Sequence, residues 1–163
     1  MSKLKYSIIP KPQKYTVTEG TYTVTQDTAV LCIPEFIKAG KYLSGFLKTK
    51  TDANNGAIKF NKDATLKSEA YKLKITTDGI TVSSADENGA FYGAVTLKIM
   101  LMQAKSADGV AVLTCCDIYD YPKYTYRGGM MDEARHFFGK EAVKNALDNM
   151  ALLKLNKFHW HLS

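Results

Sequence analysis

Strand-like alternation of apolar and polar residues dominates the first part of the chain. β-branched and aromatic residues alternate with polar ones over 15–18 and 22–25, on either side of Glu19 and Gly20. This arrangement predicts a β-hairpin that turns at the glycine. Four further strands are predicted, over residues 57–60, 71–76, 80–84 and 110–115. Asp78 and Gly79 stand between the second and third of these, and this dipeptide favours a tight hairpin.

Two helical patterns separate these strands. Pro34 suits the first turn of a helix, and the apolar residues after it recur at helical spacing towards Lys50. Residues 88–102 are apolar on most sides and predict a largely buried helix. Each element must bury its apolar side against another, so the order predicts an α+β domain, a β-sheet with helices packed on one face. We place this domain at residues 1–120.

The pattern changes after residue 120. Residues 124–132 predict a strand, 140–153 an amphipathic helix and 157–162 a second strand. Short connections make this a βαβ unit with parallel strands. A parallel sheet needs cover on both faces, so we expect residues 121–163 to be the truncated start of a larger α/β unit. Its uncovered edge and apolar face are expected to promote self-association.

Composition narrows the classes of partner and location. The net charge of +6 comes from scattered lysines and only two arginines, which argues against nucleic acid as a partner. The three cysteines lack the spacing of a zinc or redox site and predict buried thiols. No apolar run has the length of a membrane span or the form of a signal peptide, so we expect a soluble protein without membrane insertion. Earlier removal of a signal leaves both an exported and a cytoplasmic location open.

Arg127 is the first candidate for chemistry. Gly128 and Gly129 follow it, and glycines within a strand often mark the close approach of a ligand. The planar guanidinium could hold vicinal hydroxyls or a carboxylate. The alternative is that Arg127 and Asp132 are charged residues at strand ends, paired to their neighbours.

His159 and His161 form a second candidate. They are two residues apart in a strand, so their side chains point to one face, and such a pair could hold a divalent metal. A zinc site needs three or four protein ligands, and the sequence indicates no third. The spacing therefore favours hydrogen-bonded histidines, and we expect neither a metal nor a cofactor.

Several runs resemble one enzyme family. The run YRGGMMDEARHFF over 126–138, followed by MALLKLNKFHWHLS over 150–163, is similar to the opening of the catalytic barrel of β-N-acetylhexosaminidases, family 20 of the glycoside hydrolases. Residues 8–13, 88–97 and 117–124 resemble the accessory domain of that family and its junction with the barrel. Gly129 departs from the aliphatic residue that many members carry there.

The resemblance implies that residues 121–163 are the truncated start of a (β/α)8 barrel, and it also implies a reaction and its site. The family cleaves terminal β-linked N-acetylglucosamine or N-acetylgalactosamine with retention, and the substrate's own acetamido oxygen is the nucleophile. The catalytic Asp–Glu pair is expected beyond Ser163, so this chain alone should be inactive. Arg127 matches an arginine that grips sugar hydroxyls, and His161 and Asp132 take supporting roles. The implied partners are glycans with N-acetylhexosamine, while a non-catalytic carbohydrate- or partner-binding module is the alternative.

Overall fold

The computed structural model describes residues 5–49, 51–52, 56–104 and 109–163. The chain divides into two compact units, Met1–Pro122 (unit 1) and Lys123–Ser163 (unit 2). Each unit has its own sheet and is described separately.

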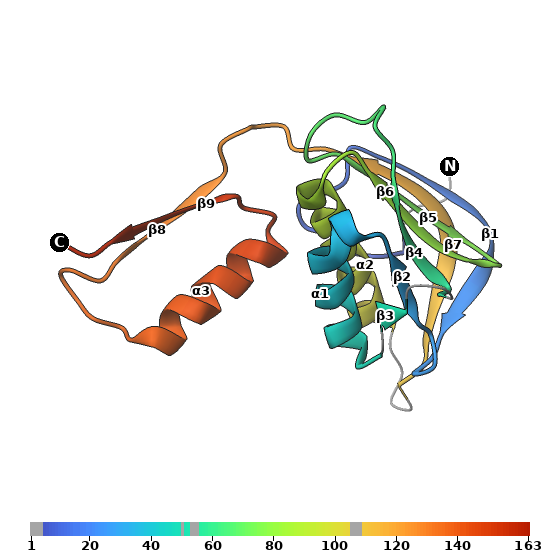
Figure 1. Ribbon diagram of the computed structural model, residues 1–163, viewed down its shortest axis with the longest axis horizontal. Coiled ribbons are helices and arrows are strands. Elements are labelled where there is room, and N and C mark those ends of the chain that lie inside the picture. The colour runs from blue at the N-terminus through green and yellow to red at the C-terminus, as the bar shows by residue number, and fades with distance from the viewer. Residues whose placement is uncertain (1–4, 50, 53–55, 105–108) are drawn as a thin grey trace. The chain divides into compact units, whose positions relative to one another are not determined.

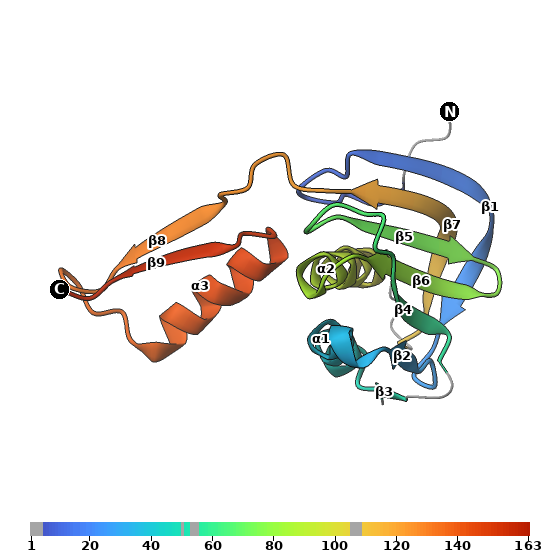
Figure 2. The same cartoon turned by 45° about the horizontal axis from the view of Figure 1, so that its top comes forward.

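Unit 1 is a sheet with helices on one face, as the pattern predicted. Its strands are β1 (Lys14–Val24), β2 (Val30–Cys32), β3 (Thr51–Asp52), β4 (Ile58–Lys62), β5 (Tyr71–Thr76), β6 (Gly79–Ser84) and β7 (Ala111–Asp120). Within the described residues these seven form one sheet in the order β1-β7-β5-β6-β4-β2-β3. A 3-10 turn (Pro34–Phe36), α1 (Ile37–Leu47) and α2 (Glu87–Ala104) complete the unit. Both α-helices lie against the same face of the sheet (Figures 1 and 2).

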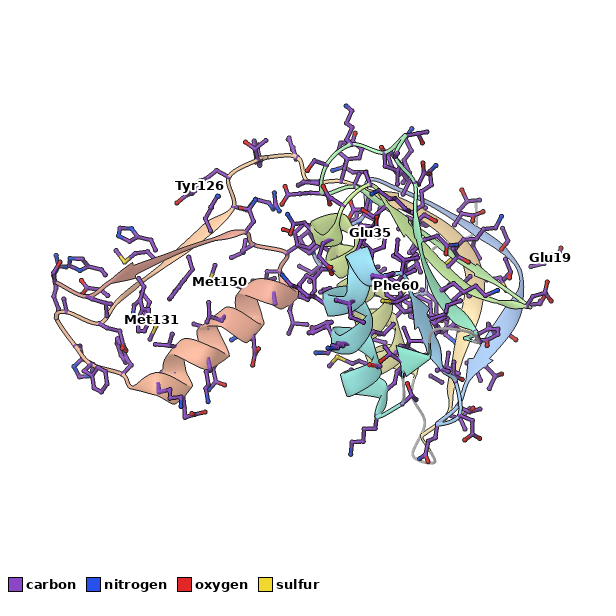
Figure 3. The ribbon with its side chains drawn as sticks, in the orientation of Figure 1. Glu19, Glu35, Phe60, Tyr126, Met131 and Met150 are labelled. Carbon is purple, nitrogen blue, oxygen red and sulfur yellow. The ribbon has the colours of Figure 1, made fainter. Side chains whose placement is uncertain are left out.

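The core of unit 1 lies between that face and the two helices. Alternation along β5 directs Tyr71, Leu73 and Ile75 inwards, where each is almost fully buried. Phe60 of β4 points into the same core (Figure 3). Burying one such side chain contributes about 1.5–3 kcal/mol, so the alternating strands fix which face of the sheet the helices cover.

The predicted hairpin over 15–25 is wrong. Residues 14–24 form one strand, β1, which pairs with β7 at both of its ends, over residues 14–17 and 21–24. The register shifts between Val17 and Thr21, and Gly20 lies inside the shift with φ +101°. Glycine adopts that conformation without strain, so Gly20 makes a bulge in one strand rather than a turn between two.

Other element boundaries differ more modestly. The β7 strand continues to Asp120, beyond the predicted end at residue 115. Helix α1 ends at Leu47, where Lys48 takes a left-handed conformation, and the predicted end at Lys50 lies outside the described residues. The short strands β2 and β3 were not predicted. No helix in the described part of the chain has the length and apolar character needed to cross a membrane.

Unit 2 is the predicted βαβ unit. It contains β8 (Gly128–Asp132), α3 (Lys140–Leu152) and β9 (Lys157–His161), and the two strands are parallel. Met131 and Met150 lie between the strands and α3 (Figure 3). Large apolar side chains remain exposed, namely Met130, Phe137, Phe138, Leu147, Leu153, Trp160 and Leu162. Self-association through them stays a prediction, as does the barrel.

Gly129 has room for a methyl group. A Cβ there would lie 3.4 Å from the Met150 sulfur, an ordinary contact, and its φ is outside the left-handed region. We expect Gly129→Ala to raise the free energy of unfolding of unit 2 by about 0.5–1 kcal/mol, because alanine loses less backbone entropy than glycine on folding. Urea unfolding followed by the fluorescence of Trp160 measures this.

Gly128→Ala is the matched control. A Cβ at Gly128 would lie only 2.8–3.0 Å from atoms of the Tyr126 ring, which would have to move. We expect this variant to gain less stability than Gly129→Ala. A larger gain in the free energy of unfolding from Gly128→Ala than from Gly129→Ala would show that the space beside Met150 does not accept a methyl group.

Candidate functional site

The carboxyl ends of β8 and β9 bring Asp132 and His161 together. The two residues are register partners at the last position of each parallel strand. His161 Nδ1 lies 3.1 Å from Asp132 Oδ1. The backbone N–H of Glu133 donates to the His161 carbonyl at 3.0 Å and extends the pairing by one residue. The structure therefore places these two predicted supporting residues in direct contact.

The Asp132 carboxylate organises the turn after β8. Its Oδ1 accepts the backbone N–H groups of Ala134 and Arg135, each at 3.1 Å. Its Oδ2 lies 3.3 Å from the Nε of Arg135. The backbone N–H of Arg135, and then the contact with His161, hold the pKa of Asp132 below its ordinary value. One carboxylate thus fixes both the backbone and the side chain at Arg135.

Arg135 is the residue at this edge that the sequence analysis did not select. Its side chain is 85% exposed, and Asp132 is the one ion-pair partner found for it among the described residues. The rest of its donor fork is directed to solvent. A signal was present in the sequence, because an aspartate three residues before an arginine can hold that arginine in a turn.

Arg127 lies at the opposite end of β8. Its Nε donates to the Lys154 carbonyl at 2.9 Å, and its Nη1 donates to the Tyr124 carbonyl at 2.8 Å. The Arg127 backbone N–H donates to Asn156 Oδ1 at 3.1 Å. These bonds tie the start of β8 to the loop after α3. The structure does not bring Arg127 together with His161 and Asp132, because Arg127 precedes the first residue of β8 and Asp132 is its last.

The residues considered for a metal do not converge with other ligands. His159 and His161 lie on the same face of β9, with ring centroids 6.5 Å apart. Within the described ranges, no group of three or more His, Cys, Asp or Glu side chains could hold a metal ion.

The three cysteines differ in burial. Cys115 and Cys116 are buried, and burial raises the pKa of the Cys116 thiol to about 12. Cys32 is only half-buried.

The Asp132–His161 contact has a measurable consequence. Because the pKa of Asp132 is lowered, its ionised carboxylate stabilises the folded state. This stabilisation is fully present above the ordinary pKa of 3.8 and is lost as the pH falls through the lowered pKa. We expect His161→Phe to move the pKa of Asp132 back towards that value, because one of the groups that favour the carboxylate is removed. Carboxyl ¹³C NMR titration measures this.

Asp63 provides the internal control for that titration. Its pKa is also lowered, by Thr65 and Lys72 of unit 1. It should titrate identically in both proteins. An unchanged Asp132 in His161→Phe would contradict the described contact.

Comparison with known proteins identifies the family of both units. Residues 5–121 match the family model described as glycosyl hydrolase family 20, domain 2. Residues 124–163 match glycosyl hydrolase family 20, catalytic domain. A β-hexosaminidase of Porphyromonas gingivalis is 31% identical over 96% of this chain, and one of Vibrio vulnificus is 32% identical over 96%. The chain spans 22% and 18% of the length of these two curated relatives.

Solved structures give the same result. An inactive mutant of a Vibrio harveyi GH20 exo-β-N-acetylglucosaminidase aligns over all of this chain and 27% of its own, with a TM-score of 0.90 and 31% identity. A Streptomyces plicatus N-acetyl-β-hexosaminidase aligns over 96% of this chain and 34% of its own, with a TM-score of 0.88 and 29% identity. The resemblance found in the sequence is confirmed, and the chain belongs to glycosyl hydrolase family 20.

Proposed function

We propose that this chain is part of a retaining β-N-acetylhexosaminidase. Residues 1–120 would be its accessory α+β domain, and residues 121–163 would open its catalytic (β/α)8 barrel. The two family matches, which meet between residues 121 and 124, support this division. The names of the relatives, β-hexosaminidase and exo-β-N-acetylglucosaminidase, support hydrolysis of terminal β-linked N-acetylglucosamine, and we include N-acetylgalactosamine in the proposal.

The observation that carries the proposal is the cluster of Asp132, Arg135 and His161 at the carboxyl ends of β8 and β9. Ligands of parallel α/β folds bind outside the carboxyl ends of the strands. Arg135 offers its exposed donor fork there, and a guanidinium fork can pair with two neighbouring sugar hydroxyls. We therefore assign sugar binding to Arg135 rather than Arg127.

Asp132 and His161 would act through Arg135. The Asp132 carboxylate holds the Arg135 backbone and side chain in place, and His161 holds Asp132. Fixing a binding group before the sugar arrives lowers the entropy cost of orienting the substrate. These residues would position the terminal sugar, while proton transfer would require the Asp–Glu pair expected outside this chain.

Hydrolysis of a chromogenic β-N-acetylglucosaminide tests the function. The product of the complete reading frame that encodes this chain should cleave it, and the 163-residue chain should not. A positioned acid/base contributes about 10²–10⁴ to the rate, so its loss should abolish measurable turnover. Cleavage by neither protein would contradict the activity, and cleavage by the short chain would contradict the expected position of the Asp–Glu pair.

A further inference from the structure

One face of the unit 1 sheet points away from α1 and α2 (Figure 2). The strand pairing places two ordered rows of side chains on that face. Cross-strand pairing sets each row. One row runs across four strands through Lys14, Tyr119, Lys72 and Ser83. The next row runs through Thr16, Asp117, Lys74 and Thr81. Residues one position apart in a strand point to opposite faces of the sheet. Tyr71, Leu73 and Ile75 of β5 point towards the helices, so Lys72 and Lys74 point away from them. Register partners share a face, and all eight side chains therefore lie on the face without helices.

These rows line a shallow groove across β1, β7, β5 and β6. Its lining includes three lysines, the hydroxyl residues Thr16, Thr81 and Ser83, and the ring of Tyr119. Asp117 contributes the one carboxylate among the described lining residues, against three lysines. The groove therefore combines positive charge with hydrogen-bonding groups that suit hydroxylated rings.

Two of the three lysines are available to an anion. Lys72 is paired with Asp63 at 3.0 Å. In the part of the chain that the structure describes, no ion pair within 4 Å is found for Lys14 or Lys74. Both side chains are exposed. An acidic ligand would meet these two ammonium groups on either side of the β7 strand.

An aromatic pair lies beside this charge. The rings of Tyr119 and Tyr121 have centroids 5.5 Å apart, and Lys67 lies 6.0 Å above the Tyr121 ring. Tyrosine offers an apolar ring face together with a hydroxyl. A sugar ring can pack on such a face while its acidic substituent meets a lysine.

We propose that this face of unit 1 binds an acidic glycan, in which sulfate or carboxylate groups meet Lys14 and Lys74 and a ring packs on Tyr119. The choice of a glycan over other polyanions rests on the proposed function. The rows themselves favour it as well, since hydroxyl groups and Tyr119 accompany the lysines and no arginine fork for phosphate is present among their eight residues.

Calorimetric titration of the 163-residue chain at physiological salt tests the inference. The probes are a sulfated heparin hexasaccharide, neutral chitohexaose and a single-stranded oligonucleotide with the same charge as the heparin probe. We expect the sulfated probe to bind most tightly. The double substitution Lys14→Gln and Lys74→Gln should weaken its binding about tenfold, because two charge-assisted contacts are removed.

A matched pair on α1 controls for net charge. Lys38→Gln with Lys41→Gln removes two exposed lysines from the helical side of unit 1, and binding of the sulfated probe should stay unchanged. Equal weakening by both pairs would overturn the proposal in favour of general charge attraction. Equal affinity for the oligonucleotide, or no binding of the sulfated probe, would overturn it too. Hydrolysis of the chromogenic substrate is a separate measurement, so failure of the function and failure of this site are distinguishable.

Discussion

Replacing Leu73 with alanine is expected to lower the free energy of unfolding of unit 1 by about 2–5 kcal/mol. Leu73 is fully buried in β5, where its register partners are Val82 of β6 and Ile118 of β7. The sheet holds it from both sides and the helices cover it, so the surroundings cannot collapse into the space left by the lost methyl groups. The loss therefore combines transfer free energy with a cavity.

Native-state hydrogen exchange of the β5 and β6 amides measures that loss. Trp160, the single tryptophan, reports unit 2 separately. Val112→Ala is the control, because Val112 lies on β7 but is 48% exposed. Its effect should stay within about 0.5 kcal/mol. Equal losses in both variants would show that Leu73 is not at the centre of the core.

In the proposed β-N-acetylhexosaminidase, expressed from the complete reading frame, replacing Arg135 with glutamine is expected to lower kcat/KM about 10–100-fold. A hydrogen bond from a charged donor is worth about 1.5–3 kcal/mol, and each 1.4 kcal/mol is a factor of ten in rate. Because the Arg135 side chain is largely exposed, its removal should leave thermal stability nearly unchanged. Steady-state kinetics and a thermal melt of the same preparation separate the two effects.

Arg127→Gln should behave in the opposite way. It removes the donors to the Lys154 and Tyr124 carbonyls, so the melting temperature should fall. The kcat/KM of the protein that remains folded should not change. A loss of kcat/KM in Arg127→Gln with an unchanged melting temperature would return the sugar-binding role to Arg127.

The alternation of apolar residues predicted most of the sheet because burial on one face acts on every second residue. It could not predict strand partners. Gly20 is compatible with a turn and with a bulge, and only the pairing of β1 with β7 on both sides of Gly20 distinguishes them. The strands β2 and β3 are too short, at three and two residues, to show a period.

The candidate site could be predicted only in part for a similar reason. The contact between Asp132 and His161 follows from two parallel strands that end in register. The choice between Arg127 and Arg135 requires knowing where β8 begins. Residues 124–127 extend the strand pattern in the sequence, yet β8 begins at Gly128, so Arg127 is left at the amino end with its donors bound to backbone carbonyls.

A crystal structure of the product of the complete reading frame with N-acetylglucosamine bound would show which arginine binds the sugar. We expect the sugar at the carboxyl ends of β8 and β9, with its hydroxyls about 2.7–3.2 Å from the Arg135 guanidinium. Asp132 should still contact both Arg135 and His161. A sugar bound against Arg127, at the amino end of β8, would show that Arg135 does not bind the substrate.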